Sequence, residues 1–278
     1  MTAVLLALAS AALFGGMTVA LRMGLRGLGD SSGAALATVI VALGVALVAA
    51  ALDLDLSGAW PFLLAGLLAP GASQILFTLA VGEVGASRTS VMVGGAPLVA
   101  VAIALVFLDE PLSLPLLLGA FAIVSGGALL AAERDRPGDL RRIGLVYAAA
   151  AAVLFATRDN LARALHTDAS PGTAAAVTLI AGTVAAALWT RRAPTSRELR
   201  RLAPAGLLFG LSYVCLFEAY FRGKVTVVSP LIATESLWGV GLSALLIRQT
   251  EGMGRRIAIG AVLVVAGGVL IGATGSQG

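Results

Sequence analysis

The sequence predicts an all-α membrane protein of ten transmembrane helices, arranged as two inverted five-helix repeats. Three observations predict this fold class: the composition, the spacing of apolar segments and an internal repeat. Of the 278 residues, 59% are hydrophobic and only 12% are charged, and the mean hydropathy is +0.97. A soluble domain usually has about a quarter of its residues charged. Most of the surface must therefore face lipid.

Ten apolar segments have the length that a transmembrane helix needs, which is about 20 residues. Most of the connections between them are only a few residues long. The first segment is preceded by no Lys or Arg, so we expect it to be a retained helix rather than a signal peptide. The predicted spans are 2–22, 33–52, 60–80, 87–108, 114–132, 143–163, 173–190, 203–221, 225–247 and 256–274.

An internal repeat divides the chain into two halves. At an offset of 141 residues, three pairs of identical residues coincide, namely Phe14 with Phe155, Arg22 with Arg163 and Glu110 with Glu251. We expect a first repeat over 1–132, a linker over 133–142 and a second repeat over 143–278. Each repeat holds five spans, an odd number, so the second copy enters the membrane from the opposite side. Inverted repeats are typical of secondary transporters, whose solute site lies between the repeats near mid-membrane.

The segment that closes the first repeat resembles a known family. In LDEPLSLPLLLGAFAIVSGGALLAA (108–132), an acidic pair precedes Pro-Leu-Ser and a glycine-rich span. This pattern is similar to the EamA-type domain of the drug/metabolite transporter superfamily, although RQTEGM (248–253) departs from it in the second copy. The resemblance implies a ten-helix exporter with a central cavity lined by spans 1, 3, 4, 6, 8 and 9. Similar members export amino acids, including aromatic ones, and related metabolites, while others carry nucleotide sugars or triose phosphates.

The basic residues indicate an orientation in the membrane. They form short clusters between apolar spans, which favours a membrane-surface role over nucleic-acid binding. The connections after the odd-numbered spans hold fifteen Arg, whereas the other side holds three Arg and one Lys. The positive-inside rule then places both termini outside. Several members of the resembled family are described with cytoplasmic termini, so both orientations stay open.

Glu235 is the deepest charged residue, because it lies almost at the centre of the span 225–247. Trp238 follows at helical spacing, so an acid and an indole can share one face. An intramembrane carboxylate usually faces a partner or a water-filled cavity. Glu235 can bind a substrate ammonium group, or it can take up a proton, since desolvation opposes the ionised form. Alternatively, it is a protonated group that fixes helix packing.

Arg158 lies late in the span 143–163, within LFATRDNLARAL, and shares a face with Phe155. Its planar fork can hold a substrate carboxylate. Alternatively, it extends to the lipid headgroups. Glu218, late in the eighth span, can pair with Arg158, and it is a second candidate for proton coupling.

Several uncharged residues complete the candidate site. Tyr213 and Phe217 form a stripe along the eighth span, and with Phe155 and Trp238 they can form an apolar wall for a substrate side chain. Further candidate binding residues are Gln74, Thr78 and Met92. Two prolines, Pro97 in the fourth span and Pro230 in the ninth, are candidate hinges, because proline removes a helical hydrogen bond.

Enzyme function is not expected. The chain has one histidine, His166, in a loop-like stretch, and it lacks HExxH, a cysteine cluster and a glycine-rich phosphate loop. We therefore expect no metal and no cofactor. The sequence predicts a multi-pass inner-membrane exporter of amino acids or similar small metabolites. The alternatives are export of another organic solute such as a cationic drug and, more distantly, an intramembrane enzyme with Glu218 and Glu235 or a structural subunit.

Overall fold

The computed structural model describes residues 2–28, 33–96, 98–99, 114–131, 141–164, 169–223, 228, 231–247 and 254–274. In these residues the regular secondary structure is helical. Several positions singled out in the sequence lie outside the described residues, namely the proposed hinges Pro97 and Pro230, together with Glu110, Glu251, His166 and most of the linker 133–142.

Each predicted span contains at least one described helix. The first half holds α1 (Thr2–Leu25), α2 (Ala34–Leu52), α3 (Pro61–Gly66), the π-helix η1 (Leu67–Ala72), α4 (Ser73–Val84), α5 (Ala86–Val93) and α7 (Leu114–Ala131). The second half holds α8 (Ile143–Ala164), α9 (Pro171–Thr190), α10 (Ser196–Arg222), α12 (Glu235–Leu246) and α14 (Arg255–Thr274). Within the described residues, five helical segments are long and apolar enough to cross a membrane: α1, α2, Pro61–Val84, α9 and α10.

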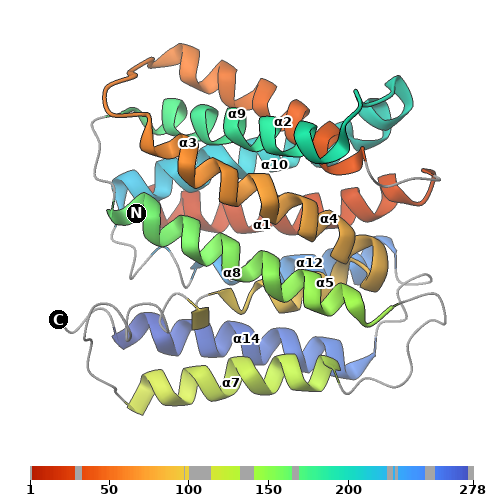
Figure 1. Ribbon diagram of the computed structural model, residues 1–278. Coiled ribbons are helices and arrows are strands. Elements are labelled where there is room, and N and C mark those ends of the chain that lie inside the picture. The colour runs from red at the N-terminus through yellow and green to blue at the C-terminus, as the bar shows by residue number, and fades with distance from the viewer. Residues whose placement is uncertain are drawn as a thin grey trace.

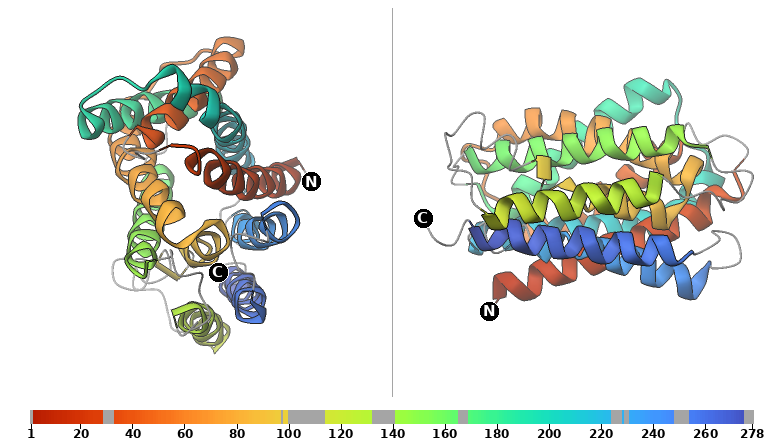
Figure 2. Two further views of the ribbon diagram at one scale, coloured as in Figure 1. Left: turned by 90° about the vertical axis from the view of Figure 1, so that its right-hand side faces the viewer. Right: turned by 90° about the horizontal axis from the view of Figure 1, so that it is seen from below.

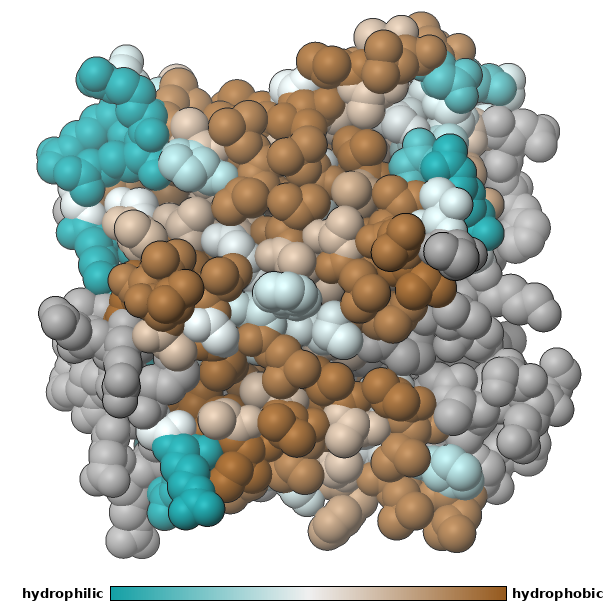
Figure 3. Space-filling view, turned by 180° about the vertical axis from the view of Figure 1, so that it is seen from behind, coloured by the Kyte–Doolittle hydropathy of each residue, from teal (hydrophilic) through white to brown (hydrophobic). Residues whose placement is uncertain are grey.

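The helices run roughly side by side, with their ends at two opposite faces (Figure 1). Seen along their length, α7 and α14 lie together at one edge of the array, and α2 and α9 lie near the opposite edge (Figure 2). The surface in Figure 3 is apolar across its middle, and hydrophilic residues gather toward its left and right edges. An apolar belt between two polar rims is the surface of a protein that spans a bilayer.

Contacts between the two halves are reciprocal. Helix α1 packs on α10, and α4 packs on α8; α2 packs on α10, and α9 packs on η1. A Cβ added to Gly206 of α10 would lie 2.8 Å from the Thr38 carbonyl oxygen of α2. The corresponding pair is Gly66 against the Thr178 carbonyl oxygen of α9, at an offset of 140 residues. Because glycine has no side chain, the helix backbones approach equally closely at equivalent places in both halves.

Helices α7 and α14 occupy corresponding positions in the repeat and run antiparallel. A Cβ on Gly126 would lie 2.8 Å from the Gly260 carbonyl oxygen, and a Cβ on Gly267 would lie 2.5 Å from the Gly119 carbonyl oxygen. The two contacts are equivalents at the predicted offset of 141, since residue 119 corresponds to 260 and residue 126 to 267. Equivalent helices that meet antiparallel require a two-fold relation whose axis is perpendicular to the helices.

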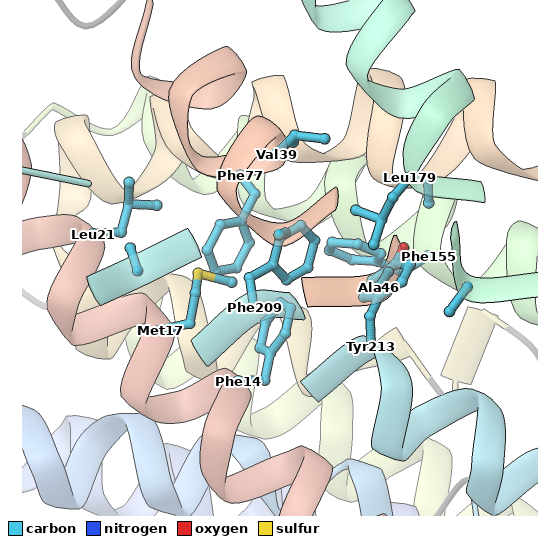
Figure 4. Close-up of a cluster of buried hydrophobic side chains, with 14 of the residues drawn as sticks. Phe14, Met17, Leu21, Val39, Ala46, Phe77, Phe155, Leu179, Phe209 and Tyr213 are labelled. Atoms are coloured by element: carbon cyan, nitrogen blue, oxygen red, sulfur yellow. The ribbon is translucent and has the colours of Figure 1, made fainter. Parts of the chain in front are cut away.

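Several aromatic residues lie together in a cluster of buried hydrophobic side chains (Figure 4). The Phe14 ring meets Phe77, Phe155 and Phe209 edge to face, with centroid distances of 5.2, 5.9 and 6.1 Å. Edge-to-face pairs are favoured because the positive ring edge meets the negative ring face. Phe14 and Phe155 are repeat equivalents, so the contact between them lies where the two halves meet.

The fourth and ninth predicted spans, 87–108 and 225–247, are interrupted by turns among the described residues. Helix α5 ends at Val93, and residues 94–95 form a turn; a second turn at 233–234 precedes α12. The turns carry short hydrogen bonds, from Gly95 N to Met92 O at 3.2 Å and from Thr234 N to Leu231 O at 3.1 Å. Hydropathy indicated the extent of these two apolar segments, whereas the position of each turn follows from the backbone path.

Candidate functional site

A cavity of about 50 Å³ lies where five helical segments converge between the two halves. It is bordered by residues of both interrupted spans, next to the turns at 94–95 and 233–234. Broken helices next to a cavity are where membrane transporters place their solute sites. The lining residues are Ser10, Phe14, Val93, Ala96, Phe155, Arg158, Asp159, Ser212, Tyr213, Leu216, Ile232 and Glu235.

The interruption of the ninth span places Glu235 in the first turn of α12, and not in the middle of a continuous helix. Its side chain borders the cavity, and the residue is only 7% exposed. The N–H groups of the following residues 236–238 donate to backbone carbonyls of 233 and 234, so the turn positions the Glu235 carboxyl at the cavity without capping it.

Arg158 of α8 is buried, with 4% of its surface exposed, so it does not extend to the headgroups. Its Nε lies 2.8 Å from Asp159 Oδ1, and its Nη1 donates to the Tyr213 hydroxyl. The guanidinium also lies over two rings, 5.8 Å from the Phe155 centroid and 5.1 Å from the Tyr213 centroid. A guanidinium held between rings, an acid and a hydroxyl has a fixed orientation toward the cavity.

The predicted alternative pairing of Arg158 with Glu218 does not form. Glu218 Oε2 lies 2.6 Å from Arg222 Nη1, one turn later on α10. The preference follows from geometry, since residues four apart on a helix are neighbours. Arg158 takes the adjacent Asp159 instead.

Two serines that the sequence analysis did not single out join α1 to α10 beside the cavity. Ser10 Oγ donates to the Ser212 carbonyl oxygen at 2.9 Å, and Ser212 Oγ donates to the Ser10 carbonyl oxygen at 2.9 Å. The two hydroxyl oxygens are 3.0 Å apart. The available signal was a polar hydroxyl in the middle of each of two apolar spans, which is common in a small-residue-rich chain.

The structure places the remaining candidates away from the cavity lining. Trp238 is 45% exposed. Phe217 is buried against Tyr213 and Phe62, with ring centroids 5.9 and 5.8 Å away. Met92 packs between two apolar clusters.

Gln74 and Thr78 are fully buried on α4, also outside that lining. Within the described part of the chain, neither the Gln74 amide nor the Thr78 hydroxyl has a hydrogen-bond partner. These groups are polar residues enclosed by packing in this conformation.

A helical bundle with an apolar belt and a charged cavity between two related halves defines a multi-pass membrane protein of the transporter class. Residues 1–132 and 142–273 each match the EamA-like transporter family, and the chain belongs to that family. Membership makes it a membrane transporter of small solutes and not an enzyme, and it agrees with the resemblance to the drug/metabolite transporter superfamily.

Fifteen solved chains match the fold. One crystal structure has 18% sequence identity to this chain and a TM-score of 0.67. The match covers 96% of this chain and 95% of the other. Its similarity extends across both repeats and concerns the fold alone. No curated protein sequence matches the chain.

Proposed function

We propose that the protein exports amino acids or similar small metabolites across the inner (plasma) membrane by alternating access, as a secondary active or facilitative transporter. The observation that carries the proposal is the charged group of Arg158, Asp159 and Glu235 around a cavity between the two repeats. An intramembrane charge is costly unless it is paired or functional. This cavity offers a guanidinium and a carboxyl to one small ligand.

The charges suit a zwitterion better than a phosphate ester. The ammonium group of an amino acid can approach Glu235, and its carboxylate can meet N–H groups of Arg158 that Asp159 and Tyr213 leave unused, since a guanidinium has five donors. A phosphate dianion needs several cations, whereas the described lining holds one cation and two carboxylates. Phe14, Phe155 and Tyr213 supply an apolar wall for a side chain.

The size of the cavity supports a cycle with more than one conformation. Its volume of about 50 Å³ holds a few waters, since one water needs about 10–15 Å³. Sites for drug-sized ligands usually measure about 300–1,000 Å³. An amino acid therefore fits only after the helices around the cavity separate.

Inverted topology and alternating access belong to the same proposal. All ten spans cross the membrane, and the antiparallel contact of α7 with α14 supports two inverted repeats. The arginine-rich ends face the cytoplasm, which leaves both termini outside.

Individual residues have roles in the same cycle. Pro97 and Pro230 act as hinges. Further residues reach the substrate in another state of the cycle, namely Trp238, Phe217, Gln74, Thr78 and Met92. Glu235, with Glu218 as the second candidate, couples proton movement to transport.

A counterflow screen of amino acids in proteoliposomes, with and without a pH gradient, tests the function. We expect uptake against preloaded amino acid, and we expect its loss in Glu235→Gln. Asp55→Asn, which removes a carboxylate from the loop between α2 and α3, is the matched control and keeps wild-type uptake. Absence of counterflow for every amino acid would refute the proposal, and wild-type uptake and pH dependence in Glu235→Gln would remove Glu235 from it.

A further inference from the structure

The charges that line the cavity are unequal. Among the described lining residues, Arg158 is the one cation, and Asp159 and Glu235 are two carboxylates. When all three are ionised, the lining carries one net negative charge. Charges in a low-dielectric site are stable only when they are compensated, so a ligand that brings one positive charge completes this site.

The two carboxylates have different surroundings. Asp159 is already paired with Arg158, at 2.8 Å. Glu235 is 93% buried, and among the described residues its carboxyl makes no hydrogen bond or ion pair, although it interacts electrostatically with both Arg158 and Asp159. The group left to recognise a ligand is therefore the Glu235 carboxyl.

Arg158 is held in place by four contacts. Asp159 neutralises its charge, the Tyr213 hydroxyl accepts one of its hydrogen bonds, and the Phe155 and Tyr213 rings lie against its guanidinium. A cation that is already compensated gains less from a ligand carboxylate than an uncompensated one does. The attraction of the site for an anionic group is therefore weaker than its attraction for an ammonium group.

We propose that Glu235 selects the substrate by its ammonium group and that a substrate carboxylate is dispensable. This inference rests on the proposed function, because it names the chemical group that the same site recognises. The substrate class is then small primary amines with an apolar side chain, with or without a carboxylate. N-acylated amino acids, which keep the carboxylate and lose the ammonium charge, are excluded.

Three ligands with one side chain test the proposal: phenylalanine, phenethylamine and N-acetylphenylalanine. Binding is measured by titration calorimetry on the full chain in lipid nanodiscs, which avoids the passive permeation of amines. We expect phenethylamine to bind at least as tightly as phenylalanine, and N-acetylphenylalanine to bind about 30-fold more weakly or worse, as for a charge pair that loses one partner. Equal binding of N-acetylphenylalanine and phenylalanine, or absence of phenethylamine binding, would overturn it.

Two isosteric variants test which carboxylate determines the selection between these ligands. Glu235→Gln is expected to weaken phenethylamine binding about 30-fold. Asp159→Asn leaves one cation and one carboxylate and exposes the charge of Arg158, so N-acetylphenylalanine should bind about tenfold more tightly than to the wild type. Asp55→Asn, at the molecular surface, is the control for both. Unchanged phenethylamine binding in folded Glu235→Gln would also overturn the proposal, and the ligand series on the wild type decides it if that variant does not fold.

Counterflow separates this inference from the proposed function. If no amino acid supports counterflow while phenethylamine binding requires Glu235, the proposed function fails and the ammonium selection stands. If amino acids support counterflow and N-acetylphenylalanine competes as strongly as phenethylamine, the function stands and the ammonium selection is overturned.

Discussion

The charged residues at the cavity and their repeat equivalents lie on corresponding helices and differ in chemistry. At the offset of 141, Arg158 and Asp159 of α8 correspond to Met17 and Thr18 of α1. The first pair borders the cavity as an ion pair, whereas Met17 and Thr18 are fully buried. The Thr18 hydroxyl donates within its own helix, to the Phe14 carbonyl oxygen at 2.9 Å. The two-fold relation therefore determines helix positions and leaves the side chains free to differ.

The same contrast holds between α10 and α4. At the offset of 140 that relates Gly206 to Gly66, Tyr213 corresponds to Ser73. Tyr213 accepts a hydrogen bond from Arg158, while Ser73 is fully buried and, in the part of the chain that the structure describes, its hydroxyl has no partner. The comparison teaches that a duplicated scaffold can concentrate its binding groups in one of two equivalent places.

The largest expected effect comes from replacing Arg158, which borders the cavity, with Met, the residue type at the equivalent position in the first repeat. Arg158→Met removes the cation and leaves buried acid uncompensated, so we expect a loss of about 3–5 kcal/mol of stability and no measurable transport. Thermal unfolding in detergent and counterflow measure the two effects. Met17→Leu is the matched change in the packed equivalent and should cost less than about 1.5 kcal/mol. Equal melting temperatures for the two variants would contradict the contrast.

Tyr213→Phe is expected to have the next largest effect. It removes the hydroxyl that accepts from Arg158, and a hydrogen bond to a charged group contributes about 1.5–3 kcal/mol. We expect transport to fall about tenfold or more, which corresponds to about 1.4 kcal/mol. Ser73→Ala, at the equivalent position, removes an unpartnered buried hydroxyl and should be neutral or stabilising. A larger loss of stability in Ser73→Ala than in Tyr213→Phe would reverse our assignment of the two positions.

The symmetric packing itself is tested by two glycine substitutions. Gly206→Ala places a Cβ 2.5 Å from Val41 Cβ, and Gly66→Ala meets the Thr178 carbonyl oxygen, so each should cost about 1–3 kcal/mol in thermal unfolding. Gly44→Ala on α2 has nothing within 4 Å of the new Cβ and should cause no loss. Destabilisation at only one of the two equivalent glycines would show that the halves pack differently.

The smallest expected effect concerns the serine pair. Ser10→Ala removes one hydrogen bond to the Ser212 carbonyl and the contact between the hydroxyls, at a cost of about 0.5–1.5 kcal/mol. A double-mutant cycle with Ser212→Ala should show coupling, because the two hydroxyls touch. Thr157→Val, whose hydroxyl is exposed and bonded within its own helix, is the control. Additive effects of the two serine changes would indicate that the hydroxyls act independently.

Most of the fold could be predicted from the sequence, because hydropathy and repetition report directly on bilayer crossing. The helices lie in the predicted segments, and the offset of 141 relates the glycine contacts of α7 and α14. Pro97 and Pro230 indicated a bend in the fourth and ninth spans, but the exact turns at 94–95 and 233–234 could not be predicted, since a turn changes the backbone path without changing apolarity.

The candidate site was predictable in part for the same reason. Arg158 and Glu235 are conspicuous as charges within apolar spans, and the structure brings both to the cavity. Trp238 was grouped with Glu235 because both fit one face of a long helix. The helix starts at Glu235, however, and Trp238 is 45% exposed. Partners across helices, such as Ser10 with Ser212, depend on tertiary packing, and a hydroxyl within each of two apolar spans does not identify the two as partners.

The antiparallel contact of α7 with α14 is isologous, like the interface of a symmetric homodimer. Gly126 meets Gly260, and their equivalents Gly267 and Gly119 meet in the same way. A surface that is complementary to its own copy can join two identical five-helix chains inserted in opposite directions. A covalent linker between the two halves makes their assembly intramolecular, so that it no longer requires two separate chains to meet. Each half is then free to change its side chains independently of the other.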